Sequence, residues 1–95
     1  MSRAIWTAPA QDDFDALDNE FSRIDPGYSW RVGRAALAAG RFLAEFPGAG
    51  PVMEDATRKW RVRGTDYVLL YRQVGAGVEI LRLIHARRDW RPRLP

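Results

Sequence analysis

The chain has 95 residues, of which 46% are hydrophobic and 12% aromatic, and its formal net charge is +3. This length suits one small domain over residues 1–95, and the apolar fraction is high enough for a hydrophobic core, which excludes wholesale disorder. The absence of cysteine excludes disulfides and thiolate metal sites. No apolar run approaches the roughly 20 residues of a membrane helix, and acids within residues 11–15 interrupt any signal peptide. We therefore expect a cytoplasmic protein.

Basic residues gather in the C-terminal part of the chain. Residues 58–93 contain ten of the fifteen Lys and Arg residues, whereas nine of the twelve acids precede Arg58. A basic half-molecule attracts an anionic partner, which is either an acidic peptide or a phosphate backbone. A solvated basic face without a partner would produce the same pattern.

The first half of the chain predicts a strand and two helices. Residues 3–7 (RAIWT) suit a short strand. A helix is then expected from Pro9 to about Ile24, because apolar residues recur every three or four positions: Phe14, Leu17, Phe21 and Ile24. We expect this stripe to belong to the core. The neighbouring acids Asp12, Asp13 and Asp15 are expected at the helix start, not in a metal site.

A second helix is predicted directly after the first. Asp25 is a suitable N-cap and Pro26 a suitable first residue, and the motif at 46–48 (FPG) ends the helix. Its apolar positions are rich in alanine, which favours close packing against the first helix. The two helices should therefore form a hairpin, with a basic face on the second one: Arg31, Arg34 and Arg41.

Beyond Thr57 the periodicity changes from helical to alternating, which indicates strands over 58–63, 67–71 and 78–85. The unbroken run YVLLY at 67–71 suits a central strand that is buried on both faces. A two-residue turn at Gly75-Ala76 would pair Val74 with Gly77, Arg72 with Glu79 and Leu70 with Leu81. The expected fold is α+β: an N-terminal strand, then a helical hairpin packed on a three- to four-stranded antiparallel sheet.

Three segments in this order resemble the RelE/ParE toxin family of type II toxin–antitoxin systems. They are residues 5–7 (IWT), 43–48 (LAEFPG) and 80–90 (ILRLIHARRDW), and the pair Tyr71-Arg72 also matches. The tail at 80–90 is the most specific segment and is most similar to the ParE branch.

The resemblance implies a cytoplasmic bacterial toxin that a cognate antitoxin neutralises. A ParD-like antitoxin has a DNA-binding N-terminal half and a flexible C-terminal segment that wraps the toxin, which implies a hetero-oligomer. The basic surface is what such wrapping would need, since charge attraction speeds and orients capture. The antitoxin-binding candidates are basic residues of the predicted sheet: Lys59, Arg61, Arg63, Arg72 and Arg82.

The family contains two branches with different targets. One resembles RelE and cleaves messenger RNA on the ribosome, using cations together with groups that transfer protons. Lys59 and Arg61 match two lysines of that branch and Arg87 approximately matches an arginine, but Val68 replaces another arginine. Trp90 is the only aromatic residue near the terminal tyrosine position, and an indole cannot act as an acid or base. This argues against nuclease chemistry.

His85 is the residue that most favours the nuclease alternative, because an imidazole can act as an acid or base near neutral pH. The catalytic set would then be Lys59, Arg61, His85 and Arg87. Alternatively, His85 packs or hydrogen-bonds to hold the tail, which we prefer. With one histidine and no cysteine we expect no metal site and no cofactor.

The other branch resembles ParE and inhibits DNA gyrase, which requires a binding surface and no catalytic residues. The target-binding candidates lie in the tail: Arg87, Arg88, Trp90, Arg91 and Arg93. Trp90 is either a contact hot spot or an anchor that folds back on the sheet. The sequence therefore favours a gyrase inhibitor over a ribosome-dependent endoribonuclease, and a non-toxic relative that only binds antitoxin is a third alternative.

Overall fold

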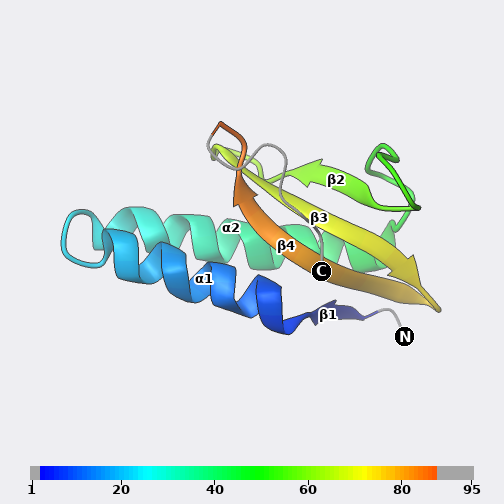
Figure 1. The fold of residues 1–95 in the computed structure, drawn as a ribbon, viewed down its shortest axis with the longest axis horizontal. Coiled ribbons are helices and arrows are strands. Elements are labelled where there is room, and N and C mark those ends of the chain that lie inside the picture. Colours follow the sequence, from blue (N-terminus) through cyan, green and yellow to red (C-terminus); the bar gives the residue numbers. More distant parts are fainter. Residues whose placement is uncertain (1–2, 88–95) are drawn as a thin grey trace.

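A computed structural model describes residues 3–87 as two helices on one face of a four-stranded sheet (Figure 1). The elements in chain order are β1 (Ala4–Trp6), α1 (Ala8–Phe21), α2 (Pro26–Glu45), β2 (Arg58–Arg61), β3 (Tyr67–Val74) and β4 (Gly77–His85). The α+β prediction is confirmed. None of the helices in the described part is long and apolar enough to cross a membrane.

The sheet is mixed, with strand order β1-β4-β3-β2. Strands β2, β3 and β4 are antiparallel neighbours, as predicted. Strand β1 differs from the prediction, because it runs parallel to β4 and pairs Ala4 with Val78. A parallel pair needs a long crossover connection, which the helical hairpin and the two following strands supply here.

The hairpin between β3 and β4 confirms two of the three predicted strand pairs. Val74 lies opposite Gly77 and Arg72 opposite Glu79. The third prediction was wrong: the register shifts at a bulge between Leu70 and Tyr71, so that Leu70 lies opposite Arg82 and not Leu81. The turn therefore fixes the register only between itself and the bulge. Beyond the bulge, the Arg82 side chain reaches Asp13 of α1.

Local signals define the helix ends. The Thr7 Oγ1 accepts a hydrogen bond from Ala10 N–H at 3.2 Å, and the Asp25 Oδ1 accepts one from Tyr28 N–H at 3.0 Å. The predicted N-cap of the second helix is therefore confirmed. The first helix ends at Phe21, three residues before the predicted end at Ile24. Ile24 itself is 79% exposed. Backbone bonds from Ile24 and Asp25 to Phe21 O close a tight connection there, so Ile24 falls outside the core.

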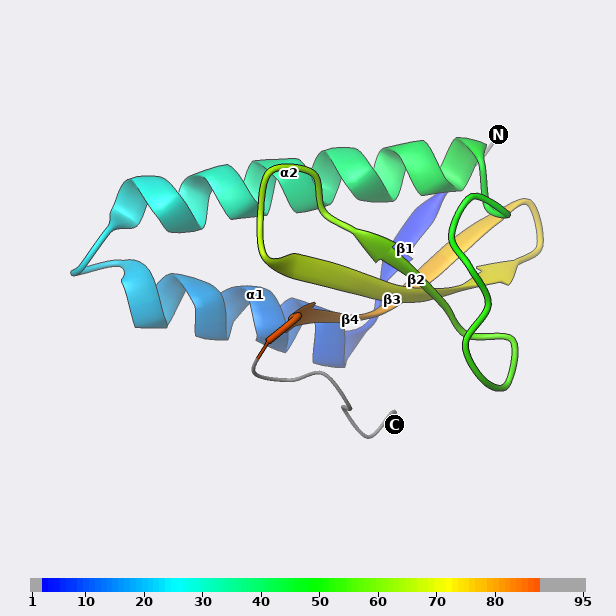
Figure 2. The same ribbon diagram turned by 90° about the horizontal axis from the view of Figure 1, so that it is seen from above.

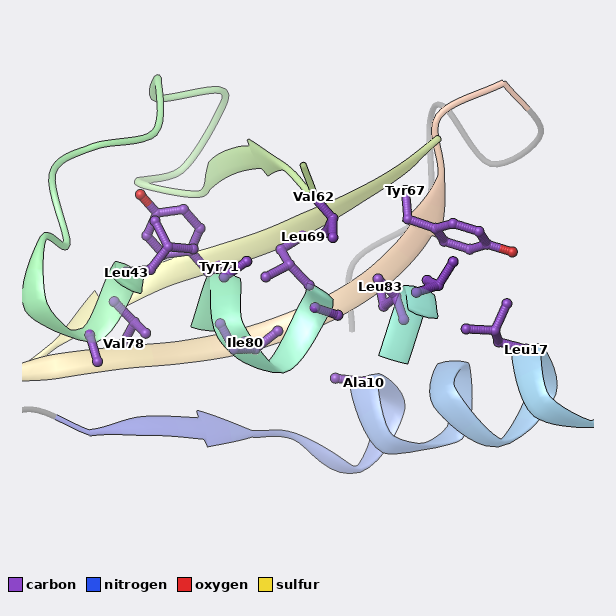
Figure 3. Packing of buried hydrophobic residues seen from close by; sticks show 14 residues of the cluster. Ala10, Leu17, Leu43, Val62, Tyr67, Leu69, Tyr71, Val78, Ile80 and Leu83 are labelled. Atoms are coloured by element: carbon purple, nitrogen blue, oxygen red, sulfur yellow. The ribbon is translucent and has the colours of Figure 1, made fainter. Parts of the chain in front are cut away.

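The core lies between the helical hairpin and the sheet. Figure 3 shows Leu17 and Leu43 of the helices facing Leu69, Ile80 and Leu83 of the strands. The run at 67–71 is buried throughout and β3 is central, as predicted. The opposite sheet face, which we call the open face, carries a smaller cluster of buried residues, namely Val68, Leu70 and Ile84. The helices therefore leave the open face uncovered (Figure 2), whereas residues 51 and 52 pair with part of the outer edge of β2.

Candidate functional site

A groove runs between α2 and the edge strand β2. Its volume is about 620 Å³, and its lining is mostly apolar: Ala35, Ala38, Ala39, Phe42, Trp60 and Arg63. Trp60 stacks on Phe42 with ring centroids 5.3 Å apart, and Phe42 also contacts Phe46 at 5.0 Å. Phe42 is 40% exposed and Phe46 59% exposed. An apolar groove of this kind is the usual form of a peptide- or helix-binding site.

The local sequence explains why the groove is hollow. Alanines at 35, 38 and 39 fall on the flank of α2 that faces β2, and their short side chains leave the space open. Trp60 and Val62 alternate with outward-facing residues and so turn toward α2. The sequence predicted a strand over 58–63 but did not identify the groove. The run of small residues on one helix flank was the available signal.

Lys59 and Arg61 lie side by side on the open face of β2, because residues two apart on a strand share a face. Arg61 Nη2 is 3.6 Å from Asp66 Oδ1, in an exposed ion pair. On β3 and β4 the predicted pair is confirmed, with Arg72 Nε donating to Glu79 Oε1 at 2.7 Å. These internal partners reduce the positive charge that Arg61 and Arg72 offer to a ligand.

Arg82 and Arg63 have different surroundings. Arg82 donates two hydrogen bonds to the Asp13 carboxylate, at 2.7 Å and 2.9 Å, and Asp13 also accepts from Leu83 N–H at 2.9 Å. Arg82 thus links β4 to α1 and is only partly exposed. Arg63 is exposed at the rim of the groove and forms no ion pair with any of residues 3–87.

His85 lies at the end of β4 on the helix side of the sheet. Its ring contacts the edge of Tyr67, with centroids 5.2 Å apart, and its Nδ1 accepts a hydrogen bond from Arg87 N–H at 3.2 Å. A small cavity of about 100 Å³ beside it is also lined by Asp13 and Glu20. These contacts match the preferred prediction that His85 packs and holds the start of the tail.

The four nuclease candidates are not brought together in one place: Arg87 adjoins His85 through its backbone N–H, but Lys59 and Arg61 lie apart from both. Lys59 and Arg61 are on the open face of β2, whereas His85 is on the other face of β4, and β3 lies between the two strands. Two strand spacings amount to about 10 Å before the thickness of the sheet is added. An imidazole there cannot share a substrate atom with these cations, since proton transfer requires hydrogen-bond distance.

The tail candidates are only partly covered by the structure. Arg87 is exposed in the turn after β4. Arg88, Trp90, Arg91 and Arg93 lie outside the described residues. Among residues 3–87, no three His, Asp or Glu side chains are grouped so that they could hold a metal ion.

Comparisons with known proteins agree with this fold. Residues 4–90 match the family model described as "ParE toxin of type II toxin-antitoxin system, parDE". A protein of Sinorhizobium fredii named "Putative toxin Y4kP" is 32% identical over 89 residues, which span 93% of this chain and 92% of that protein. A solved structure titled "Chromosomal ParDE TA system from P. aeruginosa" superposes with a TM-score of 0.77 at 21% identity, covering 90% of this chain and 96% of that one.

The family match extends over nearly all of the chain, from β1 to the residues beyond β4. The alignment with the Sinorhizobium fredii protein also covers nearly all of both chains. The shared fold places the helical hairpin and the sheet in the same arrangement as in the Pseudomonas structure. The chain therefore belongs to the ParE toxin family of type II toxin–antitoxin systems.

Proposed function

We propose that this toxin is held inactive by a cognate, ParD-like antitoxin and that it inhibits DNA gyrase when it is released. The observation that carries the gyrase proposal is the position of His85, on the opposite sheet face from Lys59 and Arg61. Among residues 3–87 these candidates do not form a proton-transfer set, which favours a toxin that acts by binding, as inhibition of a DNA-bound enzyme requires.

The groove between α2 and β2 supports the antitoxin part of the proposal. Phe42 and Trp60 form an apolar floor, and Arg63 stands at its rim. An amphipathic segment with an acidic residue beside its apolar face fits this combination. Lys59 and Arg61 lie on the adjoining open face, where they could contact a following acidic stretch. A flexible segment that folds on binding would cover both surfaces, in a toxin–antitoxin hetero-oligomer.

Antitoxin capture can be tested on the groove directly. The probe is the product of the neighbouring open reading frame, and the measurement is its dissociation constant for the purified toxin. Trp60→Ala should weaken binding by about 2 kcal/mol, a roughly 30-fold rise in Kd, since a half-buried tryptophan in a groove is a typical hot spot. Ile24→Ala is the control, because Ile24 is an exposed apolar residue outside the groove lining. Equal losses for both variants would exclude the groove.

The target can be tested with a truncated chain. Removing residues 87–95 takes away all five tail candidates but keeps Ala86, whose N–H binds Asp66 O at 2.8 Å. We expect this variant to fold and to capture antitoxin, and to lose inhibition of gyrase supercoiling. Trp90→Ala in the full chain removes the indole but keeps the four arginines, so it separates the contribution of Trp90 from that of the basic charge. Undiminished inhibition by the truncated chain would exclude the tail as the gyrase-binding element.

The ribonuclease alternative has one observation in its favour, the neighbouring cations Lys59 and Arg61, which suit a phosphate backbone. It predicts cleaved transcripts when purified toxin is added to translating ribosomes. Cleavage that disappears in His85→Ala would overturn the gyrase proposal. The third alternative, antitoxin binding without toxicity, predicts no growth defect when the chain is expressed alone.

A further inference from the structure

The outer face of the helical hairpin, on the side away from the sheet, carries a mixed basic and apolar stripe on α2. Its members recur at intervals of four, three and four residues, so they share the side opposite buried Leu43: Trp30, Arg34, Leu37 and Arg41. Trp30 is 62% exposed and Leu37 is 45% exposed. The Arg34 guanidinium lies over the Trp30 ring, 4.8 Å from its centroid. An exposed tryptophan and leucine on one helix face are typical contact points for another protein.

The neighbouring helix carries the opposite charge. α1 has five acids and no basic residue: Asp12, Asp13, Asp15, Asp18 and Glu20. Asp13 is turned toward β4, whereas Asp12 and Asp15 are exposed on the side opposite buried Leu17. Within residues 3–87, neither of these two exposed acids forms an ion pair with an arginine of α2. The outer face thus presents an acidic stripe and a basic stripe side by side, with their charges unmatched.

A partner for this face has to carry both signs. Nucleic acid or an anionic membrane would be attracted by Arg34 and Arg41 but repelled by Asp12 and Asp15 at the same surface, and a wholly acidic peptide meets the same repulsion. A second copy of this chain satisfies both stripes. When two copies are related by a twofold axis that runs parallel to the helices, between the two hairpins, α1 of each lies over α2 of the other, so that every acidic stripe meets a basic one. We propose that the free toxin self-associates in this way, through the outer faces of two hairpins.

The size of the face indicates a weak dimer. α1 has 14 residues, so it is about 21 Å long, and packed helices are about 10 Å apart. Two helix widths then give roughly 400 Å² per copy and about 800 Å² in total, which is below the roughly 1,200 Å² of stable complexes. Opposite charges must therefore contribute much of the affinity, and added salt should weaken it. The α2–β2 groove lies on the other flank of α2, so this inference is independent of the proposed antitoxin site.

The test uses the purified full chain and sedimentation equilibrium. We expect a monomer–dimer equilibrium whose Kd rises at least about tenfold between about 0.05 M and about 0.5 M NaCl. The double variants Arg34→Glu/Arg41→Glu and Asp12→Arg/Asp15→Arg should each be monomeric, because their stripes then carry one sign. An equimolar mixture of the two should re-form a dimer, since an all-acidic face meets an all-basic one. Circular dichroism on each variant separates loss of association from loss of folding.

A control variant is Glu54→Arg, which makes a comparable change at an exposed position outside the hairpin and should leave the Kd within about twofold. The proposal is overturned by a wild-type chain that stays monomeric at low salt. It is equally overturned by folded charge-reversed variants that still dimerise alone, or by a mixture of them that remains monomeric.

Discussion

The ion pair between Asp13 of α1 and Arg82 of β4 should be a main anchor of the helical hairpin on the sheet. Asp13 accepts three hydrogen bonds, two from the guanidinium and one from Leu83 N–H, between 2.7 Å and 2.9 Å. The two side chains are only 25% and 16% exposed, for Arg82 and Asp13 respectively. Asp13→Ala removes all three contacts and leaves a partly buried guanidinium without this partner.

The loss of unfolding free energy expected for Asp13→Ala lies between two limits. Breaking a fully buried pair costs about 3–5 kcal/mol, whereas an exposed pair contributes about 0–1 kcal/mol because solvent screens it. The low exposure of Asp13 and its additional bond to a backbone N–H favour a value nearer the upper limit. We therefore expect Asp13→Ala to lower the free energy of unfolding by about 2–3 kcal/mol. For a domain of this size that corresponds to a fall in Tm of at least about 8 °C.

The assay is urea denaturation followed by far-ultraviolet circular dichroism, applied to a double-mutant cycle of Asp13→Ala and Arg82→Ala. The coupling free energy should be at least about 1 kcal/mol, since the residues are in direct contact. Asp15→Ala is the control, because Asp15 is an exposed acid of the same helix, and it should change stability by less than about 0.5 kcal/mol. If Asp13→Ala is no more destabilising than this control, the pair does not anchor the hairpin.

Three further substitutions test the core and the sheet by thermal or urea denaturation. Gly77→Ala should destabilise by several kcal/mol, since a Cβ there would collide with Arg3 O on the β1 side. Gly48→Ala, whose Cβ would enter open space, should be near neutral. Tyr71→Phe should cost about 1–3 kcal/mol, because its hydroxyl is the partner of a buried N–H in the loop after α2. Leu69→Ala should cost about 2–5 kcal/mol, and a loss below 1 kcal/mol would contradict its complete burial.

Sequence patterns alone were sufficient for the local features of this protein. Asp25 and Pro26 start α2 because a capping carboxylate and a fixed φ act within one turn. The turn at Gly75-Ala76 set the register of the nearest strand pairs, because a two-residue turn fixes which residues lie opposite each other beside it. The unbroken apolar run at 67–71 identified the central strand, because apolar side chains on both faces of a strand must both be covered by other parts of the protein.

The candidate site was predictable only in part. Lys59 and Arg61 could be placed on one face from their spacing. Whether His85 shared that face depended on the bulge at Leu70 and on the strand order, neither of which is encoded in the few residues around it. Phe42 and Trp60 are distant in sequence, so the groove between them exists only once α2 has been laid against β2.

The amino-acid sequence by itself determined which segments are helices and strands, where most of them end and where the basic residues accumulate, since these depend on neighbours within a turn or a hairpin. Tertiary structure decided the parallel pairing of β1 with β4, the exposure of Ile24 and the link from Asp13 to Arg82. Asp13 and Arg82 are 69 residues apart. Contacts at that separation arise only when the whole core assembles, because no local signal selects one carboxylate of α1 over its neighbours.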